Sequence, residues 1–328
     1  MKRTSGSNKA RPHNTWAPAL LIALGVTTAL HAQTLQLSKE YIRLGGRILA
    51  IEQDASPGDT APVYEGWAYL NHTPTSGWIV VGAGDFDRNG VPDLVYMNTS
   101  TRQVTVNYFG GAGGAQYLGY AYLNSSGNPG WTVTAVADFN GDGVPDLVWQ
   151  NDSTHQVTVN YYGGAGGATL TGWKWLNQAG GTAGYTVVAA ADFDGNATPD
   201  LVWENLSSGQ VTVDYYSYVS GSPTYTSTAW LSQSGYPGWT VRGAIDMNGD
   251  GVPDLIWQNN STGQVTVHFY GGAGGAVDQG WGWLHQASDN SGWRVAAVAD
   301  FDGNGTPDLV WQQLASPNAV SVNYYGPA

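Results

Sequence analysis

A nine-residue segment recurs five times in the chain, and this repetition constrains the fold more than any other feature. The first copy reads DFDRNGVPD at residues 85–93, and the other copies begin at Asp138, Asp192, Asp246 and Asp300. The intervals between the copies are 53, 54, 54 and 54 residues. Self-similarity at a fixed period is the mark of an architecture built from stacked supersecondary units. The sequence therefore predicts a repeat protein.

Each copy also has the composition of a metal-ligand loop. The shared pattern is D-x-[DN]-x-[DN]-G-x-P-D, with alanine in place of the glycine in one copy. Oxygen ligands at alternate positions, followed by a turn-forming glycine, wrap a short chain around a hard cation, as in the first half of an EF-hand loop. Here the closing carboxylate stands at position 9 and a strand follows, so the loop is not an EF-hand. One copy alone could be a solvated turn, but five copies in register favour five metal sites.

The residues around each loop predict four strands per repeat. In the second repeat these strands cover residues 131–137, 146–151, 156–162 and 172–177. The metal loop joins the first two strands, a polar turn joins the next two, and a glycine-rich segment precedes the fourth. Four short antiparallel strands in a unit of about 40 to 55 residues are typical of a β-propeller blade. The small residues of the first strand suit a crowded position beside a central channel.

The two ends of the array predict that the ring closes. The last repeat supplies only three strands and ends at residues 322–326, whereas an isolated fourth-strand sequence, residues 66–71, precedes the first loop. We expect this N-terminal strand to complete the last blade, which leaves no open sheet edge between the ends. Residues 61–328 number 268, or about 54 per blade. The predicted fold class is all-β, a five-bladed β-propeller of four-stranded antiparallel blades.

The segment before the repeats has two predicted parts. Residues 1–32 have a basic start, an apolar stretch from Ala19 to Leu30 and a cleavage site after Ala32, as in a secretory signal peptide. The apolar stretch is too short to span a bilayer, although an uncleaved anchor remains the alternative. Residues 33–60 are expected to form a β-hairpin extension and a linker. The hairpin either docks on another surface or acts as a flexible stalk.

Composition excludes several classes of protein. The net charge is −13, and fifteen of the 25 acidic residues are the loop aspartates. A basic footprint for nucleic acid is absent. The chain has no cysteine, so disulfides and thiolate metal sites are excluded. No second apolar run exists, so we expect a secreted or periplasmic monomer without membrane insertion.

We expect the protein not to be an enzyme. The six histidines form no set that recurs across the repeats. No G-x-S-x-G setting surrounds a serine, and the glycine-rich segments lack the Lys-Ser/Thr of a phosphate-binding loop. No catalytic residues are therefore assigned.

Aromatic residues on the predicted fourth strands are candidates for ligand binding. They occur in pairs spaced by two residues, which places both rings on one face of a strand. Exposed aromatic rings can stack on the C–H faces of sugars. The alternative is a purely structural role, in which the rings pack against the glycine-rich backbone. The strand before the fourth loop has Thr228 where others have Trp, so four sites are expected, with the inter-blade region near Gln150, Gln258 and Gln312 as an alternative location. The candidate ligand-binding residues are Trp67, Tyr120, Trp173, Trp175, Trp281 and Trp283.

The repeats resemble the FG-GAP/VCBS family, the repeat of integrin α-subunit propellers and of many secreted bacterial proteins. The copy DFNGDGVPDLVW at residues 138–149 carries the resemblance, as do the Gly-Gly-Ala-Gly-Gly segments after Phe109, Tyr162 and Tyr270. The resemblance implies calcium in the loop joining the first two strands of each blade. Some family members are lectins, including fungal ones that recognise N-acetylglucosamine between blades, and others serve adhesion. The fold alone does not choose between these roles.

The resemblance also implies the calcium ligands, up to five ions in all. Side-chain ligands are expected at loop positions 1, 3, 5 and 9, and a backbone carbonyl at position 7. In the first two loops they are Asp85, Asp87, Asn89, Val91 and Asp93, then Asp138, Asn140, Asp142, Val144 and Asp146. In the third and fourth they are Asp192, Asp194, Asn196, Thr198 and Asp200, then Asp246, Asn248, Asp250, Val252 and Asp254. In the fifth they are Asp300, Asp302, Asn304, Thr306 and Asp308.

Two hypotheses on function follow from these features. The first is a secreted, calcium-binding, multivalent glycan-binding module. The second is a calcium-rigidified protein-interaction or adhesion module without a sugar site. In both, the third loop is expected to bind calcium most weakly, because Ala197 replaces the glycine of the other loops and a Cβ disfavours a positive φ.

Overall fold

The computed structural model describes residues 40–44, 47–52, 61–71, 76–181, 184–288, 290, 292–315 and 318–327. The chain divides into two units, Met1–Asp54 and Ala55–Ala328. In the first unit, β1 (Glu40–Leu44) and β2 (Arg47–Glu52) pair as an antiparallel hairpin. The predicted signal peptide (residues 1–32), the turn at Gly45–Gly46 and most of the linker lie outside the described residues.

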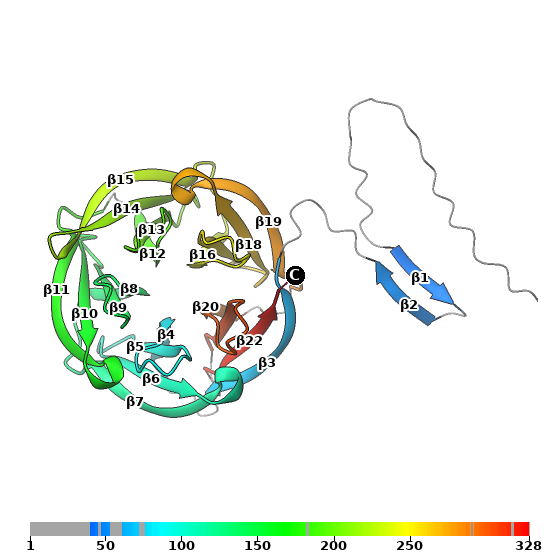
Figure 1. Ribbon diagram of the computed structural model, residues 1–328, viewed down its shortest axis with the longest axis horizontal. Helices are drawn as coiled ribbons and strands as arrows, with labels where there is room; N and C mark the ends of the chain where they lie inside the picture. Colours follow the sequence, from blue (N-terminus) through cyan, green and yellow to red (C-terminus); the bar gives the residue numbers. More distant parts are fainter. Residues whose placement is uncertain are drawn as a thin grey trace, which may run out of the picture. The chain divides into compact units, whose positions relative to one another are not determined.

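Twenty strands of the second unit form five four-stranded antiparallel sheets around a ring (Figure 1), which confirms the predicted five-bladed propeller. Each sheet is called a blade here and is numbered in chain order. Blade 1 contains β4 (Trp78–Gly84), β5 (Asp93–Asn98), β6 (Val104–Gly110) and β7 (Gln116–Asn124). Blade 2 contains β8 (Trp131–Ala137), β9 (Asp146–Asn151), β10 (Val157–Gly163) and β11 (Thr169–Asn177).

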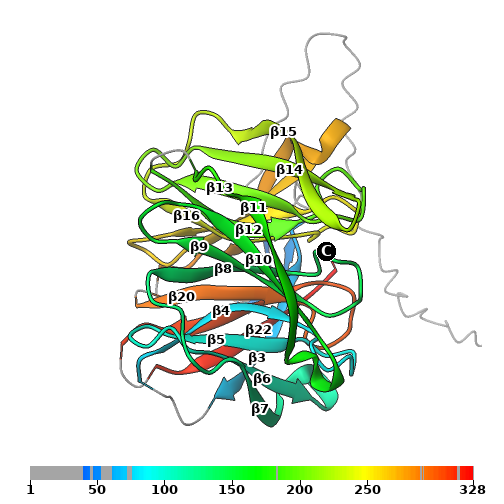
Figure 2. The same cartoon turned by 90° about the vertical axis from the view of Figure 1, so that its left-hand side faces the viewer.

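The remaining blades repeat this order. Blade 3 contains β12 (Tyr185–Ala191), β13 (Asp200–Asn205), β14 (Val211–Val219) and β15 (Ser222–Ser232). Blade 4 contains β16 (Trp239–Ile245), β17 (Asp254–Asn259), β18 (Val265–Gly271) and β19 (Val277–His285). Blade 5 contains β20 (Trp293–Ala299), β21 (Asp308–Gln313), β22 (Val320–Gly326) and β3 (Val63–Asn71). Figure 2 shows β11 passing over the outside of blade 2.

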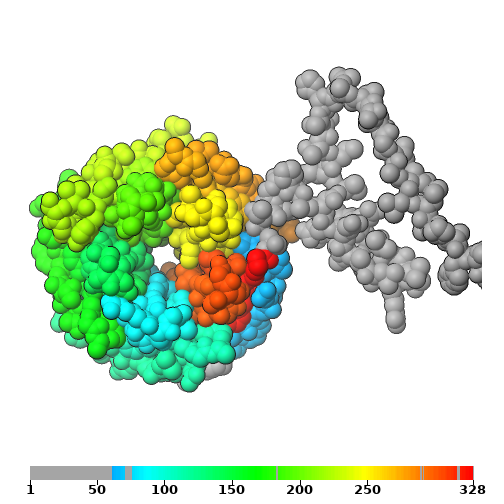
Figure 3. All heavy atoms as spheres, viewed as in Figure 1, coloured from blue at the N-terminus to red at the C-terminus, as the bar shows by residue number. Residues whose placement is uncertain are grey.

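Small side chains on the first strands allow them to approach the ring axis. A Cβ added to Gly82 would lie 2.4 Å from Cγ2 of Val136 in the next blade, and one added to Gly243 would lie 2.6 Å from Cγ2 of Val298. A narrow opening remains on the axis (Figure 3), and residues of all five first strands line a cavity of about 80 Å³ there. The crowded inner position predicted from the sequence is thus confirmed.

The N-terminal strand closes the ring. β3 pairs antiparallel with β22, and the register places Trp67 opposite Asn323. Blade 5 therefore combines three strands from the end of the repeats with one from their beginning, as the sequence predicted. Its hydrophobic core is continuous with that of blade 1, because Leu70, Val310 and Val322 pack in one cluster with Val80 and Leu94.

Three short 3-10 helices lie in the glycine-rich segments: η1 (Ala112–Gly114), η2 (Ala165–Gly167) and η3 (Ala273–Gly275). Their final glycines have positive φ and press against the metal loop of the preceding blade. A Cβ on Gly167 would lie 2.2 Å from the carbonyl oxygen of Phe86. The Tyr108 hydroxyl donates a 2.6 Å hydrogen bond to the Gly166 carbonyl, which links blade 1 to the same turn. No helix in the described part of the chain has the length and apolar character needed to cross a membrane.

Glutamine side chains on the second strands join neighbouring blades. The amide oxygen of Gln258 accepts from the Val295 N–H (3.1 Å), and its Nε2 donates to the Trp293 carbonyl (3.0 Å). Gln312 makes the same pair of bonds to blade 1. Glu204 takes this position in blade 3. Its Oε2 accepts from the Val241 N–H at 3.0 Å, but its buried Oε1 has no hydrogen-bond partner among the residues that the structure describes.

Replacement of Glu204 by glutamine is expected to stabilise the protein above neutral pH. Burial raises the pKa of Glu204 from 4.5 to about 7, against the Val241 hydrogen bond and the Arg242 charge, which lower it. Because the folded protein holds this proton more tightly than the unfolded chain, its contribution is complete below pH 4.5 and is lost as pH rises through 7. At pH 8, Glu204→Gln should raise the free energy of unfolding by on the order of 2 kcal/mol, and at pH 5 by little.

Urea midpoints of the wild type and the variant at both pH values, in one calcium buffer, measure this difference. Gln258→Glu is the matched control. It places a carboxyl group at the equivalent position of blade 4, where the glutamine makes both hydrogen bonds to the next blade, and it should introduce the same pH dependence of the free energy of unfolding. An equal difference between wild type and Glu204→Gln at pH 5 and pH 8 would show that this carboxyl does not titrate in the window.

Candidate functional site

The five repeated loops join the first and second strands of the five blades. In three of them, carboxylate oxygens of three aspartates all lie within 4.8 Å of one another. These groups are Asp85, Asp87 and Asp93; Asp192, Asp194 and Asp200; and Asp300, Asp302 and Asp308. The loops that begin at Asp138 and Asp246 have asparagine at position 3, so one carboxylate of the trio is replaced by an amide oxygen.

The aspartate at position 9 ties each loop to the third strand of its blade. Asp93 is fully buried, and its two carboxylate oxygens accept 2.9 Å hydrogen bonds from the N–H groups of Phe86 and Phe109. Burial raises the pKa of this carboxyl to about 7, against the lowering effect of those two bonds. The same two bonds and the same shift recur at Asp146, Asp200, Asp254 and Asp308. The sequence did not reveal this structural role, because both donors lie outside the motif's polar positions.

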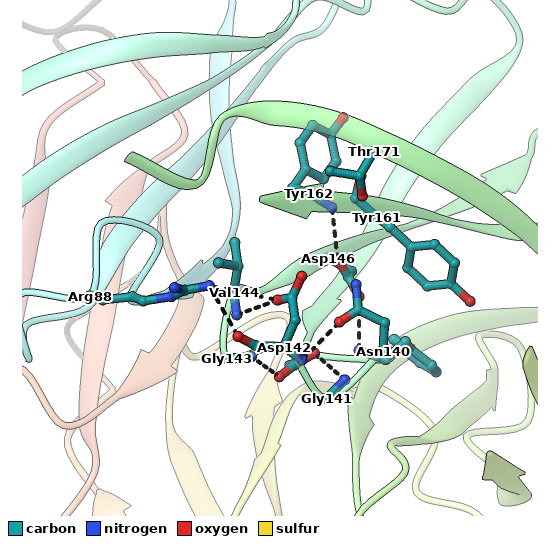
Figure 4. Close-up of polar contacts among 12 residues, drawn as sticks. Arg88, Asn140, Gly141, Asp142, Gly143, Val144, Asp146, Tyr161, Tyr162 and Thr171 are labelled. Carbon is teal, nitrogen blue, oxygen red and sulfur yellow. Dashed lines mark hydrogen bonds and ion pairs between the residues drawn. The ribbon is translucent and has the colours of Figure 1, made fainter. Parts of the chain in front are cut away.

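Hydrogen bonds inside each loop hold the side-chain oxygens of the motif against N–H groups of the same loop. In the loop of blade 2 (Figure 4), Asp138 accepts from the N–H groups of Gly141 and Gly143, both at 2.7 Å. Asp142 accepts from the Val144 N–H at 2.8 Å. The predicted side-chain ligands of a loop thus come together on the short segment that the sequence indicated.

The residue at position 5 divides the loops into two kinds. Asn89 donates from Nδ2 to the Phe109 carbonyl at 2.7 Å, and Asn196 and Asn304 make the equivalent bond in blades 3 and 5. Asp142 and Asp250 have no N–H to donate, so these loops lack that bond to the third strand. Both kinds present only carboxylate, amide and carbonyl oxygens, the donor set preferred by hard cations such as Ca²⁺ and Mg²⁺. The residues present therefore fit a divalent cation.

Position 6 requires a positive φ in every loop. Ala197 has φ +66°, and the glycines at the same position have φ between +80° and +88°. The third loop was expected to bind calcium most weakly because Ala197 would stand at a positive φ, and this φ is confirmed. The affinity of the third loop for calcium stays a prediction. Position 4 has the same requirement, and there Arg88 (φ +61°) stands where the other loops have glycine. The strain at Arg88 was not predicted from the sequence; its Nη2 donates to the Asp142 carbonyl at 3.0 Å.

Ala197→Gly is expected to raise the free energy of unfolding by about 1 kcal/mol, because glycine adopts positive φ without a Cβ penalty. Where the turn forms only as the cation binds, the same energy appears instead as about fivefold tighter cation binding at this loop. Urea unfolding and a calcium titration measure the two effects. Gly305→Ala is the control, because its Cβ would meet no atom within 4 Å and should cost a similar amount through strain alone. If neither substitution changes stability, position 6 tolerates alanine.

The outer-strand aromatic residues meet in pairs, in which Trp67, Tyr120, Trp173 and Trp281 are exposed whereas Trp175 and Trp283 are half-buried. Trp67 is 55% exposed, Trp173 54% and Trp281 51%. Edge-to-face contacts join the two rings of each pair, with centroids 4.8 to 5.9 Å apart: Trp67–Tyr69, Tyr120–Tyr122, Trp173–Trp175 and Trp281–Trp283. The glycine-rich turns accept hydrogen bonds from third-strand tyrosines instead, namely Tyr108, Tyr215 and Tyr324.

Three cavities open between blades, beside these rings. The cavity at blade 3 has a volume of about 650 Å³ and includes Trp203, Tyr225 and Trp230 in its wall. The cavity at blade 5 has about 570 Å³ and includes Trp67 and Tyr69, and that at blade 1 has about 320 Å³ and includes Tyr120 and Tyr122. In the first two, the end of the fourth strand of the preceding blade, with the loop after it, forms the opposite wall.

The sequence predicted the positions of these cavities only in part. Trp173, Trp175, Trp281 and Trp283 do not line any of the three. The largest of the three lies at blade 3, the blade that the pattern had left out because of Thr228. The inter-blade glutamines Gln150, Gln258 and Gln312 are buried and bonded to the next blade. Gln150 also lines a further inter-blade cavity of about 330 Å³.

Blade 4 shows how one residue can fill such a cavity. The Tyr236 ring packs edge-on against Trp257 and His268, with centroids 5.2 and 5.1 Å away, and His268 stacks on Trp281. Tyr236 occupies the turn position of Asn290 in blade 5, because each accepts the N–H of the tryptophan that opens the following strand. This substitution was visible in the sequence, but its effect depends on side chains from another blade.

The repeat pattern matches that of known proteins. The FG-GAP-like repeat matches residues 85–149, 138–203 and 246–311, which together include all five loops. The chain belongs to the FG-GAP-like repeat family. The five-bladed ring described above is thus the architecture of an FG-GAP-like propeller, and the resemblance noted in the sequence is confirmed. Among curated proteins, none matches the chain significantly.

Solved structures with a similar fold are distant from this FG-GAP-like propeller. The rhamnogalacturonan lyase YesW is 12% identical, with 86% of this chain and 80% of the lyase covered and a TM-score of 0.37. The TcdB2-TccC3-Cdc42 structure is 14% identical, with 80% and 15% covered and a TM-score of 0.42. The Bacillus licheniformis rhamnogalacturonan lyase PL11 is 14% identical, with 83% and 54% covered and a TM-score of 0.32. The chain thus spans about half of PL11 and a small part of the TcdB2-TccC3 chain.

Proposed function

We propose that this protein is a secreted, calcium-binding propeller that acts as a lectin-like, multivalent glycan-binding module. The observation that carries the proposal is the set of three inter-blade cavities, each walled by exposed aromatic rings. Residues 1–32 support secretion through their signal-like sequence. No catalytic role is assigned to any residue.

The cavities have the chemistry that sugars require. Aromatic rings offer flat apolar faces for the C–H groups of a sugar ring, and amides beside them can exchange hydrogen bonds with hydroxyls. Trp67 stands opposite Asn323 at blade 5, and Tyr120 stands opposite Asn107 at blade 1. Several weak sites around one ring give avidity for a polymer without any new contact.

Calcium is the proposed cation of the five loops. The three carboxylate groups within 4.8 Å and the fully buried aspartate at position 9 need a positive charge to offset their repulsion and burial. Extracellular calcium is abundant enough for weak modules with millimolar Kd. The proposed ligands are the loop residues at positions 1, 3, 5, 7 and 9 given above. The ion would rigidify the loops and through them the blade walls.

Binding to immobilised glycans in calcium buffer tests the proposal. The double variant Trp67→Ala, Trp230→Ala removes one ring from each of the two largest cavities and is expected to weaken binding at least tenfold. The matched control is Trp173→Ala, Trp281→Ala, which removes two equally exposed rings that line none of the three cavities. Calcium-dependent melting should be retained in both variants.

The outcomes separate the alternatives. Loss of binding only in the control variant would place the sugar on the open strand surface and overturn the cavity assignment. If no glycan binds the wild type in calcium, the protein is instead a calcium-rigidified protein-interaction or adhesion module.

A further inference from the structure

One of the three cavities has a carboxylate in its wall. Asp214 of β14 lines the cavity at blade 3. The equivalent position, identified by its pairing with the fourth strand, is occupied in the other blades by Asn107, Asn160, His268 and Asn323. His268 is neutral, because burial lowers its pKa to about 4. Blade 3 is therefore the one blade with a carboxyl group at this point.

The residue opposite Asp214 is small. Thr228 pairs with Asp214 in the β14–β15 register, where the other blades have Tyr120, Trp173, Trp281 or Trp67. The Thr228 hydroxyl donates to Oδ1 of Asp214 and lies 2.9 Å from the Tyr225 hydroxyl. Asp214 is partly exposed, as are the asparagines at the equivalent position of three other blades, and its cavity is the largest of the three.

Aromatic rings surround the carboxylate. Five of them line the cavity: Tyr185, Trp203, Tyr216, Tyr225 and Trp230. Trp203 is 3% exposed. Its buried indole N–H makes no hydrogen bond of normal distance and angle to any described residue. It lies close enough to Asp214 to lower the pKa of that carboxyl, as does the Thr228 hydroxyl, while burial raises it more strongly.

No cationic side chain compensates Asp214. The residues lining this cavity include no lysine, arginine or histidine. Aromatic faces attract a cation through their quadrupole, and a carboxylate adds a charge-assisted hydrogen bond when the cation has an N–H. The cavity at blade 5 has aromatic rings as well, but an amide in place of the carboxylate.

We propose that the cavity at blade 3 binds a protonated amine, and that its ligand is a glycan with free amino groups. This inference rests on the proposed glycan-binding function and names the sugar class for one of its sites. The acceptors available to the ammonium N–H groups are the Asp214 carboxylate, the Tyr225 hydroxyl and the Asn177 side chain, all in the cavity wall. A cavity of about 650 Å³ is in the usual range for sites that enclose small ligands.

Titration calorimetry of the full chain in calcium, at about pH 6 so that amines are protonated, tests the proposal. The probes are a glucosamine trisaccharide, its fully N-acetylated counterpart and tetramethylammonium chloride. The wild type should bind the amino trisaccharide at least tenfold more tightly than the acetylated one, and Asp214→Asn should remove at least tenfold of that affinity. Asparagine occupies this position in three other blades, so the variant is expected to fold. Thr228→Trp, which introduces the residue found at this position in blades 2, 4 and 5, should crowd the space beside Asp214 and also weaken binding.

Each outcome decides one of the two proposals. Equal binding of the two trisaccharides, or unchanged binding in Asp214→Asn, overturns the amine site. Binding of other glycans without any preference for the amino sugar also overturns it and leaves the proposed function intact. If tetramethylammonium binds in an Asp214-dependent way and no trisaccharide binds, the cation site is supported and its glycan ligand is overturned together with the proposed function.

Discussion

Chelation of calcium is expected to lower the melting temperature of this protein by roughly 15 °C. If free calcium is about tenfold above the Kd of each loop, linkage gives about 1.4 kcal/mol per site, or about 7 kcal/mol for five sites. For a protein of this size, each kcal/mol corresponds to about 2 °C in Tm. The total is comparable with the whole stability of a typical domain, so the chelated protein should be close to unfolding at moderate temperature.

The structure gives the physical reason for this dependence. Carboxylate oxygens of three aspartates lie within 4.8 Å of one another in each of three loops. Two charges at about 4 Å repel by about 4 kcal/mol for an effective dielectric near 20. The aspartate at position 9 is fully buried in all five loops and holds the loop against the third strand. A cation bound between these carboxylates would replace their repulsion by attraction, in the loop that joins the first two strands of each blade.

Calorimetric melting in chelator, followed by addition of calcium, measures the effect. The double variant Asp300→Asn, Asp302→Asn disables one loop and should remove about a fifth of the calcium-dependent shift, which separates specific binding from a general effect of ionic strength. A Tm that is unchanged by both chelator and calcium would contradict the assignment of these loops as calcium sites.

Deletion of the closing strand is expected to abolish the folded propeller, whereas deletion of the segment before it is not. Removing residues 33–60 leaves β3 in place, and this variant should melt close to the full chain. Removing residues 33–72 also deletes β3, so β22 loses its partner from Val63 to Asn71 and the core around Leu70 loses one wall. An exposed edge and an open core between blades 5 and 1 should leave that variant unfolded or aggregated.

Circular dichroism and analytical size exclusion at 25 °C distinguish the two deletions. A synthetic peptide of residues 63–71 provides the control, because an extended segment can add to an open sheet edge and should partly restore the β-strand signal of the shorter variant. Two deletions that melt at the same temperature would show that β3 does not contribute to closure.

The features that repeat along the chain were predictable, because each copy of the repeat can be compared with the other four. The five-bladed ring, its closure by residues 66–71 and the positive φ at Ala197 all followed from comparing one copy with the rest, and the structure confirms them. The two hydrogen bonds that Asp93 accepts were not predicted. The sequence of a ligand motif does not show whether its last carboxylate also binds the third strand.

The features that break the repeat were harder to interpret. Thr228 was taken as the loss of a site, yet the blade that carries it has the largest of the three cavities, with Asp214 in its wall. Tyr236 passed without notice, yet its ring occupies the equivalent space in blade 4. Both effects arise where side chains from two consecutive blades meet. A periodic pattern identifies which residues share a strand face, but it does not give the space left between two blades.

The pairing of β3 with β22 also determines when the fold can be completed during synthesis. Val320 pairs with Asn71, so the first propeller strand to leave the ribosome must wait for one made some 250 residues later. At about 5–20 residues per second this interval is on the order of 10 to 50 s. Until then β3 and the inner faces of the neighbouring blades have no partner. If residues 1–32 direct export as proposed, this delay is useful, because a ring that cannot close before its last strand is made remains open, and hence threadable, through the whole of translation.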